Sequence, residues 1–183
     1  MVDKYTEKTI SQKTIYDGAV IRVNVETVEL PNGKQAMREL VHHRGAVGIL
    51  AITPANKIVL VSQYRKALDK TILEIPAGKL EEGEKPLESA YRELQEETGY
   101  TTSTMQQITK FYTSPGFADE LIYLFKAGDL KKGKANLDED EFVDTVELSL
   151  FEVAELTRKG AINDAKTLIA IYYWQTEVLK GRL

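Results

Sequence analysis

Three glutamates within five residues, Glu93, Glu96 and Glu97, are the side chains of this sequence best suited to chemistry. On a helix, positions i, i+3 and i+4 share one face, with Cβ atoms about 5–6 Å apart. Like charges at this spacing destabilise an isolated helix by roughly 0.2–0.5 kcal/mol per pair. No lysine or arginine follows Glu93 or Glu97 four residues later. This face is therefore either a solvated acidic surface or a site for a cation.

The segment around these glutamates concentrates the acidity of the chain. Residues 74–100 contain eight glutamates and three basic residues, a local charge of −5, whereas the 183-residue chain has a formal net charge of −4. Clustered carboxylates repel one another and oppose folding, so such a segment is expected to have a function. Carboxylate oxygens are preferred ligands of hard divalent cations, which favours Mg²⁺, or Mn²⁺, as the bound ion.

The glutamates are expected on a helix that covers residues 86–98. Pro86 suits the first turn of a helix, where its missing N–H is no loss, and Gly99 stands where a C-terminal cap belongs. A short strand over residues 71–75 and a turn at Pro76-Ala77-Gly78 precede it. The stripe predicted to face the core consists of Leu87, Ala90, Tyr91 and Leu94.

Apolar patterns predict strands through most of the remaining chain. These strands cover residues 19–30, 35–42, 45–53, 58–63, 107–113, 121–127 and 142–148, and residues 1–14 form a polar lead-in or an edge strand. Asn32-Gly33 predicts a hairpin turn. Two more helices are expected at 150–158, after a capping box of Ser149 and Glu152, and at 164–180. The core side of the last helix is predicted to hold Leu168, Ile171, Tyr172 and Leu179. This order of elements indicates a mixed α/β sandwich.

Composition narrows the class of protein. A hydrophobic fraction of 43% and a charged fraction of 28% are typical of a globular domain. The absence of cysteine excludes a disulfide framework, a thiolate nucleophile and a Cys-ligated metal. No signal peptide or run of about 18 apolar residues is visible, and a pI near 5.4 argues against nucleic-acid binding. We predict a cytoplasmic protein with no membrane or nucleic-acid partner.

The spacing of residues in the acidic segment resembles the signature of the Nudix hydrolase family. Five residues separate Gly78 from Glu84, and seven more separate Glu84 from Arg92-Glu93-Leu94, before Glu96-Glu97 and Gly99-Tyr100. The resemblance implies an α/β fold, a Nudix-type α/β/α sandwich with a mixed sheet and an N-terminal antiparallel β extension. We place the extension at residues 1–45 and the hydrolase domain at 46–183.

The resemblance also implies roles for the residues of the signature. Glu93 and Glu97 match the principal metal ligands, and Glu96 matches an accessory ligand with a catalytic role. The carbonyl of Ala77 matches a backbone ligand, and Arg92 matches an arginine that orients the glutamates. Two or more Mg²⁺ ions, or Mn²⁺, are implied. For Glu84, support of the loop and a place in the metal shell remain alternatives.

Substrate choice depends on residues outside the signature. Pro115 follows Gly99 by sixteen residues, in the sequence Ser-Pro-Gly-Phe, which resembles the marker of the ADP-ribose pyrophosphatase group. The resemblance implies that Arg65 contacts the diphosphate and that Arg38 meets the substrate; a surface arginine is the alternative for each. The substrate-binding residues expected on this basis are Arg38, Arg65, Glu74, Pro115, Gly116 and Phe117. Ala19 and Val20 are too small to stack on adenine, so Tyr16 or Phe117 is expected to replace an aromatic residue there.

The catalytic base is expected in a loop after the signature. Residues 137–141 form the one acidic loop in that position, with Glu141 as first choice and Glu139 as second. A disordered acidic linker is the alternative. The base would accept a proton from a metal-bound water that attacks phosphorus. His42 and His43 are interpreted as strand residues rather than as ligands.

Three functional hypotheses follow. The leading one is Mg²⁺-dependent hydrolysis of ADP-ribose to AMP and ribose 5-phosphate. The second keeps this chemistry for another nucleoside diphosphate sugar or a dinucleotide. The third is a non-catalytic, nucleotide-sensing module of the same fold. The resemblance further implies a homodimer formed through residues 1–45.

Overall fold

The computed structural model describes residues 4–137 and 142–182, which fold into two compact units. The first unit comprises Met1–Gly45 and Tyr112–Leu121, and the second comprises Ala46–Phe111 and Ile122–Leu183. None of the described helices is long and apolar enough to cross a membrane.

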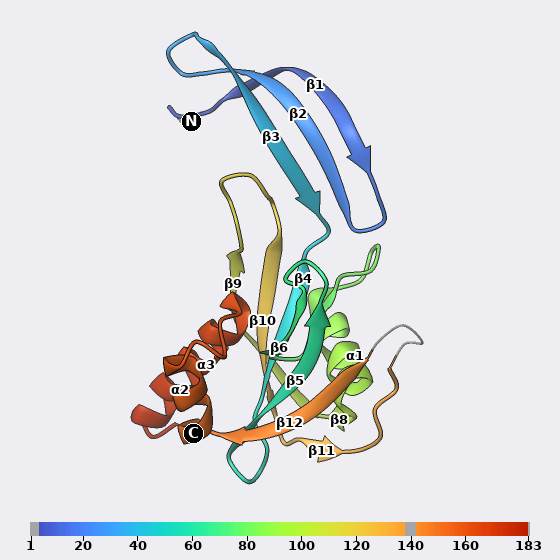
Figure 1. Cartoon of the computed structure of the whole chain (residues 1–183), viewed down its shortest axis with the longest axis vertical. Helices are drawn as coiled ribbons and strands as arrows, with labels where there is room; N and C mark the ends of the chain where they lie inside the picture. Colours follow the sequence, from blue (N-terminus) through green and yellow to red (C-terminus); the bar gives the residue numbers. More distant parts are fainter. Residues whose placement is uncertain (1–3, 138–141, 183) are drawn as a thin grey trace. The chain divides into compact units, whose positions relative to one another are not determined.

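The first unit is built on a three-stranded antiparallel sheet with the order β1-β2-β3 (Figure 1). Its strands are β1 (Lys8–Asp17), β2 (Ile21–Glu29) and β3 (Gln35–His43). Every residue of β1 is exposed, as expected of an edge strand. The predicted hairpin joins β2 to β3: Gly33 has a φ of 77°, and its N–H donates to the carbonyl of Leu30 at 2.9 Å. Glycine reaches this left-handed conformation without a Cβ penalty.

The second segment of the first unit is a loop that pairs with β3. Val41 and Ala118 form a parallel bridge. The N–H of Val41 donates to the carbonyl of Phe117 at 2.8 Å, and the N–H of Asp119 donates to the carbonyl of Val41 at 3.1 Å. The loop that carries Pro115 is therefore fixed by backbone hydrogen bonds to this sheet.

The second unit contains a mixed sheet with the order β7-β4-β10-β9. Its strands are β4 (Ala46–Ala51), β7 (Ala77–Lys79), β9 (Thr104–Tyr112) and β10 (Leu121–Gly128). β4 is parallel to β10 and antiparallel to β7. An antiparallel sheet has the order β12-β5-β6, formed by β5 (Lys57–Arg65), β6 (Lys70–Glu74) and β12 (Val143–Ser149). A short pair consists of β8 (Tyr100–Thr101) and β11 (Lys131–Lys132).

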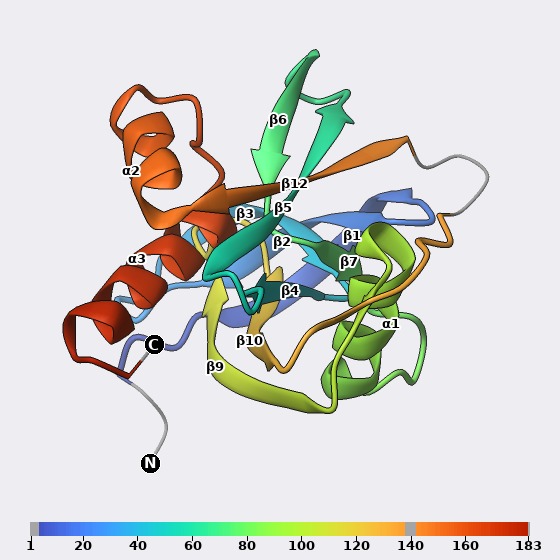
Figure 2. The ribbon, with the colours of Figure 1, turned by 90° about the horizontal axis from the view of Figure 1, so that it is seen from below.

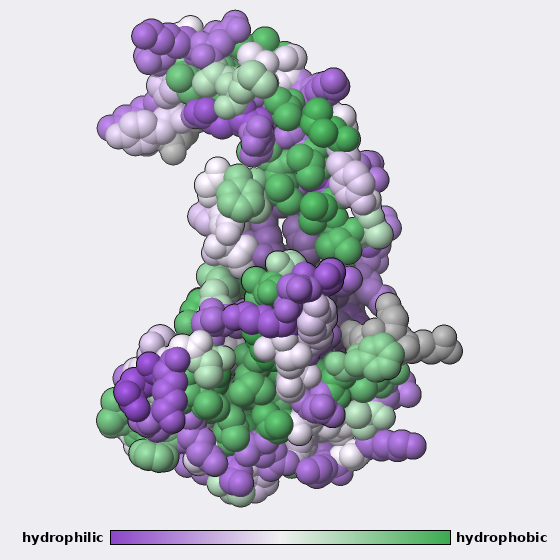
Figure 3. Space-filling view, viewed as in Figure 1, coloured by the Kyte–Doolittle hydropathy of each residue, from purple (hydrophilic) through white to green (hydrophobic). Residues whose placement is uncertain are grey.

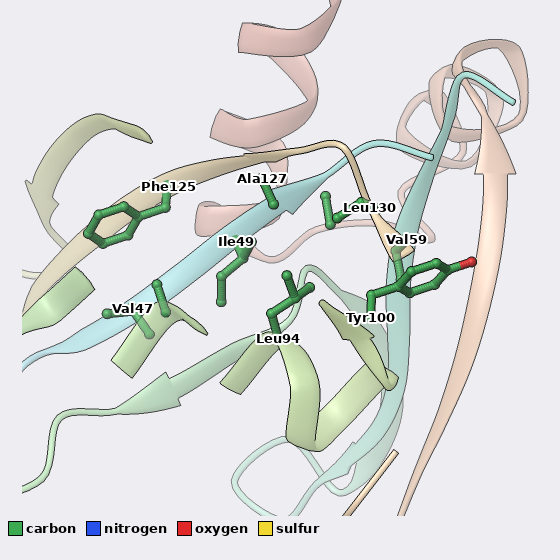
Figure 4. Close-up of a cluster of buried hydrophobic side chains, with 10 residues drawn as sticks. Val47, Ile49, Val59, Leu94, Tyr100, Phe125, Ala127 and Leu130 are labelled. Carbon is green, nitrogen blue, oxygen red and sulfur yellow. The ribbon is translucent and has the colours of Figure 1, made fainter. Parts of the chain in front are cut away.

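Three helices cover the sheets of this unit, with α1 on one side and α2 and α3 on the other (Figures 1 and 2). They are α1 (Pro86–Thr98), α2 (Leu150–Arg158) and α3 (Ala165–Leu179). Ile49 of β4 packs in one cluster with Leu94 of α1 (Figure 4), whereas its neighbour Leu50 packs with Trp174 of α3. Because successive strand residues point to opposite faces, β4 supplies both layers of the core. The predicted α/β/α sandwich is confirmed.

Both predicted helix stripes are wrong in part. Leu87 and Tyr91 are exposed, and α1 instead buries Glu93 and Glu97 beside Ala90 and Leu94. From sequence, the glutamates were expected on the face opposite the stripe, as a solvated acidic surface or a cation site, and not among the buried residues of α1.

Of the stripe predicted for α3, Tyr172 and Leu179 are exposed, and the buried residues of the helix include Ala170, Ile171 and Trp174. The helix packs through a face rotated by about one residue from the predicted one, because Trp174 fills the core.

Candidate active site

Glu93 lies directly against strand β7 (Ala77–Lys79), where the sequence predicted a turn at Pro76-Ala77-Gly78. Ala77 and Gly78 instead pair with β4. A Cβ atom placed on Gly78 would come within 1.8 Å of the Glu93 carboxyl carbon. No real Cβ tolerates such an approach, so only glycine leaves room for this carboxylate, which is 7% exposed as a residue. The close approach of backbone and carboxylate explains why β7 has glycine at this position.

Glu97, one helical turn after Glu93, is held against the same strand β7. Its side chain is buried, and Oε2 accepts a hydrogen bond from the N–H of Ala77 at 3.0 Å. The contact of Ala77 with the glutamates is thus made by its N–H in this structure. Two carboxylates, Glu93 and Glu97, are therefore buried side by side on one helix face, where burial is costly without compensating charge or hydrogen bonds.

Arg92 supplies much of that compensation. Its Nη1 donates to Glu93 Oε1 at 2.8 Å and to Glu96 Oε2 at 2.9 Å. Its Nε and Nη2 donate to the two carboxylate oxygens of Glu84, both at 2.9 Å. A single guanidinium thus binds three glutamates, with a two-pronged geometry toward Glu84 that suits arginine and not lysine.

Glu84 is fixed by this pairing rather than left as a free ligand. The hydrogen bonds from Arg92 lower the pKa of the Glu84 carboxyl to about 2. The N–H of Glu81 also donates to Glu84 Oε2, at 3.0 Å. In turn, the hydrogen bond to Glu84 is the largest cause that raises the pKa of Arg92. The arrangement corresponds to support of the loop, the first of the two alternatives for Glu84.

The carboxyl end of α1 is joined to the chain on either side of residues 138–141. The N–H of Asn136 donates to the carbonyl of Glu96 at 3.0 Å, and the hydroxyl of Thr145 donates to the carbonyl of Glu97 at 3.4 Å. The predicted bases, Glu139 and Glu141, lie outside the described residues.

Over the described ranges 4–137 and 142–182, no three His, Cys, Asp or Glu side chains are grouped so that they could hold a metal ion. Instead, Arg92 and the Ala77 N–H engage the glutamates.

Arg65, at the end of β5, pairs with the buried carboxylate of Glu74. Its Nε donates to Glu74 Oε1 at 2.6 Å and its Nη2 to Oε2 at 2.9 Å. Glu74 is 1% exposed and also accepts a hydrogen bond from the ammonium of Lys166 in α3. Burial opposes ionisation of Glu74, but Arg65 and Lys166 outweigh it and lower its pKa. Sequence reasoning missed Lys166, because nothing in the helical pattern of α3 indicates a partner 92 residues earlier.

The other predicted substrate residues lie in the first unit. Arg38 pairs with Glu7, with Nε to Oε2 at 2.8 Å and Nη2 to Oε1 at 2.6 Å. Pro115 and Gly116 form the turn of the loop, and the side chain of Phe117 is exposed.

The histidines of β3 bind this same loop. Nδ1 of His42 lies 2.7 Å from Asp119 Oδ2, and the backbone N–H of His43 donates to Asp119 Oδ1 at 2.8 Å. Both histidines are strand residues, as predicted, and Asp119 is a loop anchor that sequence reasoning missed.

Comparison with known families accounts for most of the chain. Residues 42–171 match the NUDIX domain, and residues 7–41 match the nucleoside diphosphate sugar hydrolase N-terminal domain. The chain is 53% identical over 181 residues to the methanol dehydrogenase activator of Bacillus methanolicus, covering 97% of this chain and 98% of that protein. It is also 53% identical over 171 residues to the ADP-ribose pyrophosphatase of Bacillus subtilis (strain 168), covering 92% of each.

A solved structure has the same fold. The crystal structure of an ADP compounds hydrolase superimposes with a TM-score of 0.83 at 24% identity and covers 97% of both chains. The chain is therefore a member of the Nudix hydrolase family, in which it groups with the ADP-ribose pyrophosphatases.

Proposed function

We propose that this protein hydrolyses the diphosphate of ADP-ribose to AMP and ribose 5-phosphate. The observation that carries the proposal is the pair of buried carboxylates, Glu93 and Glu97, packed on Ala77 and Gly78 of β7. The 53% identity to the Bacillus subtilis ADP-ribose pyrophosphatase supports this substrate. All three signature glutamates expected to bind metal, Glu93, Glu96 and Glu97, are present, which argues against a non-catalytic sensing module.

The donor chemistry of the same residues suits a divalent cation, although the described carboxylates are not grouped around an ion site as they lie in this structure. Glu93, Glu96, Glu97 and the Ala77 carbonyl offer only oxygen donors, which suit Mg²⁺ or Mn²⁺. Gly78 leaves the space in which the Glu93 carboxylate lies. We propose that these groups hold two or more ions. When bound, such ions would polarise a phosphate and lower the pKa of a bound water. With ions bound, Arg92 would orient Glu93 and Glu96, and the ions would share in neutralising their charge.

Arg65 is the proposed diphosphate contact of the second unit. Its Nε and Nη2 are taken by Glu74, whereas its Nη1 has no hydrogen-bond partner among the described residues. The side chain is 39% exposed, so Nη1 can donate to a phosphate oxygen. In the first unit, Arg38, Pro115, Gly116 and Phe117 remain proposed substrate contacts. Glu141, or else Glu139, remains the predicted base.

The test is the kinetics of Glu97→Gln with ADP-ribose and Mg²⁺. Glutamine can still accept from the Ala77 N–H but lacks the charge that an ion requires. We expect turnover to fall by roughly 100-fold or more with an unchanged circular dichroism spectrum. The matched control is Glu88→Gln, an exposed glutamate of the same helix, which should keep full activity.

Two results would overturn parts of the proposal. Unchanged turnover in Glu97→Gln would contradict the metal site. Faster hydrolysis of GDP-mannose than of ADP-ribose at equal concentration would contradict the substrate, and it would favour the second hypothesis. That hypothesis has support in the GDP-mannose pyrophosphatase of Cronobacter sakazakii, 32% identical over 168 residues.

A second candidate function is activation of a methanol dehydrogenase. It is favoured by the full-length match to the activator of Bacillus methanolicus. The test adds the purified protein to a bacterial methanol dehydrogenase and measures alcohol oxidation. Stimulation by the wild type but not by Glu97→Gln would assign the effect to the proposed hydrolytic site. No stimulation would exclude this function for the dehydrogenase tested.

We further propose a homodimer formed through the first unit. Large apolar side chains of that unit are exposed, and hydrophobic residues (green) lie on its surface in Figure 3. They include Ile10, Ile15, Tyr16, Val20 and Met37. Light scattering on the purified protein should give twice the chain mass of 20.6 kDa. A monomer would contradict this proposal without affecting the hydrolase assignment.

A further inference from the structure

Helix α3 begins with a group of polar residues that contact the end of strand β6, next to the proposed active site. Asp164 caps the helix, with Oδ2 accepting from the N–H of Thr167 at 3.0 Å. Lys166, in the first turn, hydrogen-bonds to Glu74 and lies 3.1 Å from Asp164 Oδ1. The side chain of Lys166 is only 12% exposed.

The position of Lys166 is unfavourable for the helix itself. A cation at the amino end of a helix opposes the helix dipole, and removing an ammonium from water is costly. Both costs are offset here by Glu74 and Asp164. The placement of this charge is therefore explained by what it contacts and not by helix stability.

Lys166 and Arg65 share one buried carboxylate. Glu74 Oε1 binds Arg65 Nε, and Oε2 binds both Arg65 Nη2 and the Lys166 ammonium. With Lys166 in place, Glu74 is held from the α3 side and presents both oxygens to Arg65. The guanidinium is thereby oriented with Nη1 pointing away from Glu74.

Thr167 binds Ile75, the residue that follows Glu74 at the end of β6. Its hydroxyl accepts from the N–H of Ile75 at 2.9 Å and donates to Asp164 Oδ2 at 2.6 Å. Two residues further along, the N–H of Ala77 donates to Glu97. The start of α3 is therefore bonded to the short stretch that connects Glu74, the last residue of β6, to β7.

We propose that Asp164, Lys166 and Thr167 form a positioning element of the active site, in which Lys166 orients Arg65 through Glu74. The proposal rests on the proposed role of Arg65 as a diphosphate contact. Lys166 does not touch the substrate; it fixes the residue that does. Its loss should weaken substrate binding while the metal-binding glutamates stay in place.

The test is a double-mutant cycle of Lys166→Met and Arg65→Ala, measured by ADP-ribose kinetics with Mg²⁺. Methionine keeps the length and apolar stem of lysine and removes the charge. A contact that binds the ground state and the transition state alike affects KM and not kcat, so we expect Lys166→Met to raise KM roughly tenfold with kcat changed less than about twofold. In the Arg65→Ala background the same substitution should change KM less than about twofold. The control is Lys180→Met, an exposed lysine at the end of α3, which should match the wild type.

Three outcomes would overturn the proposal. Additive effects in the cycle would show that Lys166 acts independently of Arg65. A fall in kcat with unchanged KM would show a role outside substrate binding. A shift in the Mg²⁺ concentration needed for half-maximal activity would show a general disturbance of the glutamates.

A separate binding measurement distinguishes this proposal from the proposed function. Calorimetric titration with ADP-ribose in the presence of a chelator needs no turnover. If the wild type binds ADP-ribose but does not hydrolyse it, the proposed activity fails, and roughly tenfold weaker binding by Lys166→Met still supports the positioning role. Equal binding by wild type and Lys166→Met contradicts that role.

Discussion

At the scale of single residues, Gly78 is the clearest case of a position where a neighbouring side chain, that of Glu93, leaves room for glycine alone. We expect Gly78→Ala to displace the Glu93 carboxylate, because the new methyl group would occupy its position. Turnover of ADP-ribose should fall by roughly 100-fold, a loss typical of a displaced electrostatic group. Steady-state kinetics measure the turnover, and a thermal melt on the same preparation measures the stability of the fold.

Gly160→Ala is the matched control for that substitution. Gly160 has a φ of 71°, and no neighbouring atom lies within 4 Å of the place that a Cβ would take, so alanine should add backbone strain alone. We expect a loss of about 1–2 kcal/mol of stability and full activity. Equal activity losses in the two variants would contradict the role given to Gly78.

Glu84 gives a prediction about pH. Its pKa is lowered from 4.5 to about 2 by Arg92, so the ion pair stabilises the fold above pH 4.5. The stabilisation should be lost progressively as pH falls from 4.5 toward 2, because the unfolded chain takes up the proton first. Glu84→Gln should therefore be less stable than the wild type at neutral pH, and the difference should shrink in acid. Urea unfolding from neutral pH down to about 3 measures it; a constant difference would contradict the pairing.

The residues of the site differ in how well sequence could predict them. Glu93, Glu96 and Glu97 have a signal in helical spacing, because their relation is local. Lys166 and Asp119 have none, because each depends on a contact with a residue far away in the sequence. The burial of Glu93 and Glu97 was also not predictable from hydropathy, since it depends on Arg92 and Gly78.

At the scale of elements, local sequence signals were sufficient to predict both ends of α1 and the start of α2. α1 begins at Pro86 and ends before Gly99, and α2 has the predicted capping box of Ser149 and Glu152. The strands β8 and β11 were not predicted, because two-residue strands leave no pattern to detect. The wrong faces given to α1 and α3 have a different cause, since tertiary packing decides between similar apolar stripes.

The cap of α2 can be tested independently of catalysis. The Ser149 hydroxyl accepts from the Glu152 N–H, and the Glu152 carboxylate accepts from the Ser149 N–H at 2.8 Å. We expect Ser149→Ala to cost about 1 kcal/mol, or roughly 2–4 °C in melting temperature, with unchanged kinetics. A melting temperature equal to that of the wild type would show that α2 is held by packing alone.

At the scale of the whole molecule, the core residues of the two main hydrophobic clusters all belong to the second unit. The proposed ion ligands and Arg65 lie in that unit, whereas Arg38 and Pro115 lie in the first. From sequence we predicted a β-rich extension before residue 46. The assignment of residues 112–121 to the first unit was not predictable, because it depends on backbone pairing between Val41 and Ala118.

The hydrogen bonds of Arg92 have a consequence for handling the protein. Because the arginine already binds Glu84, Glu93 and Glu96, the fold carries an internal counter-charge, and we expect it to persist without an added ion. After dialysis against a chelator, we expect an unchanged circular dichroism spectrum, no turnover, and full activity once Mg²⁺ is restored. Irreversible unfolding on chelation would contradict this. The enzyme should then be one that can be stored empty and charged with the metal of choice, which makes direct comparison of Mg²⁺ and Mn²⁺ possible on a single preparation.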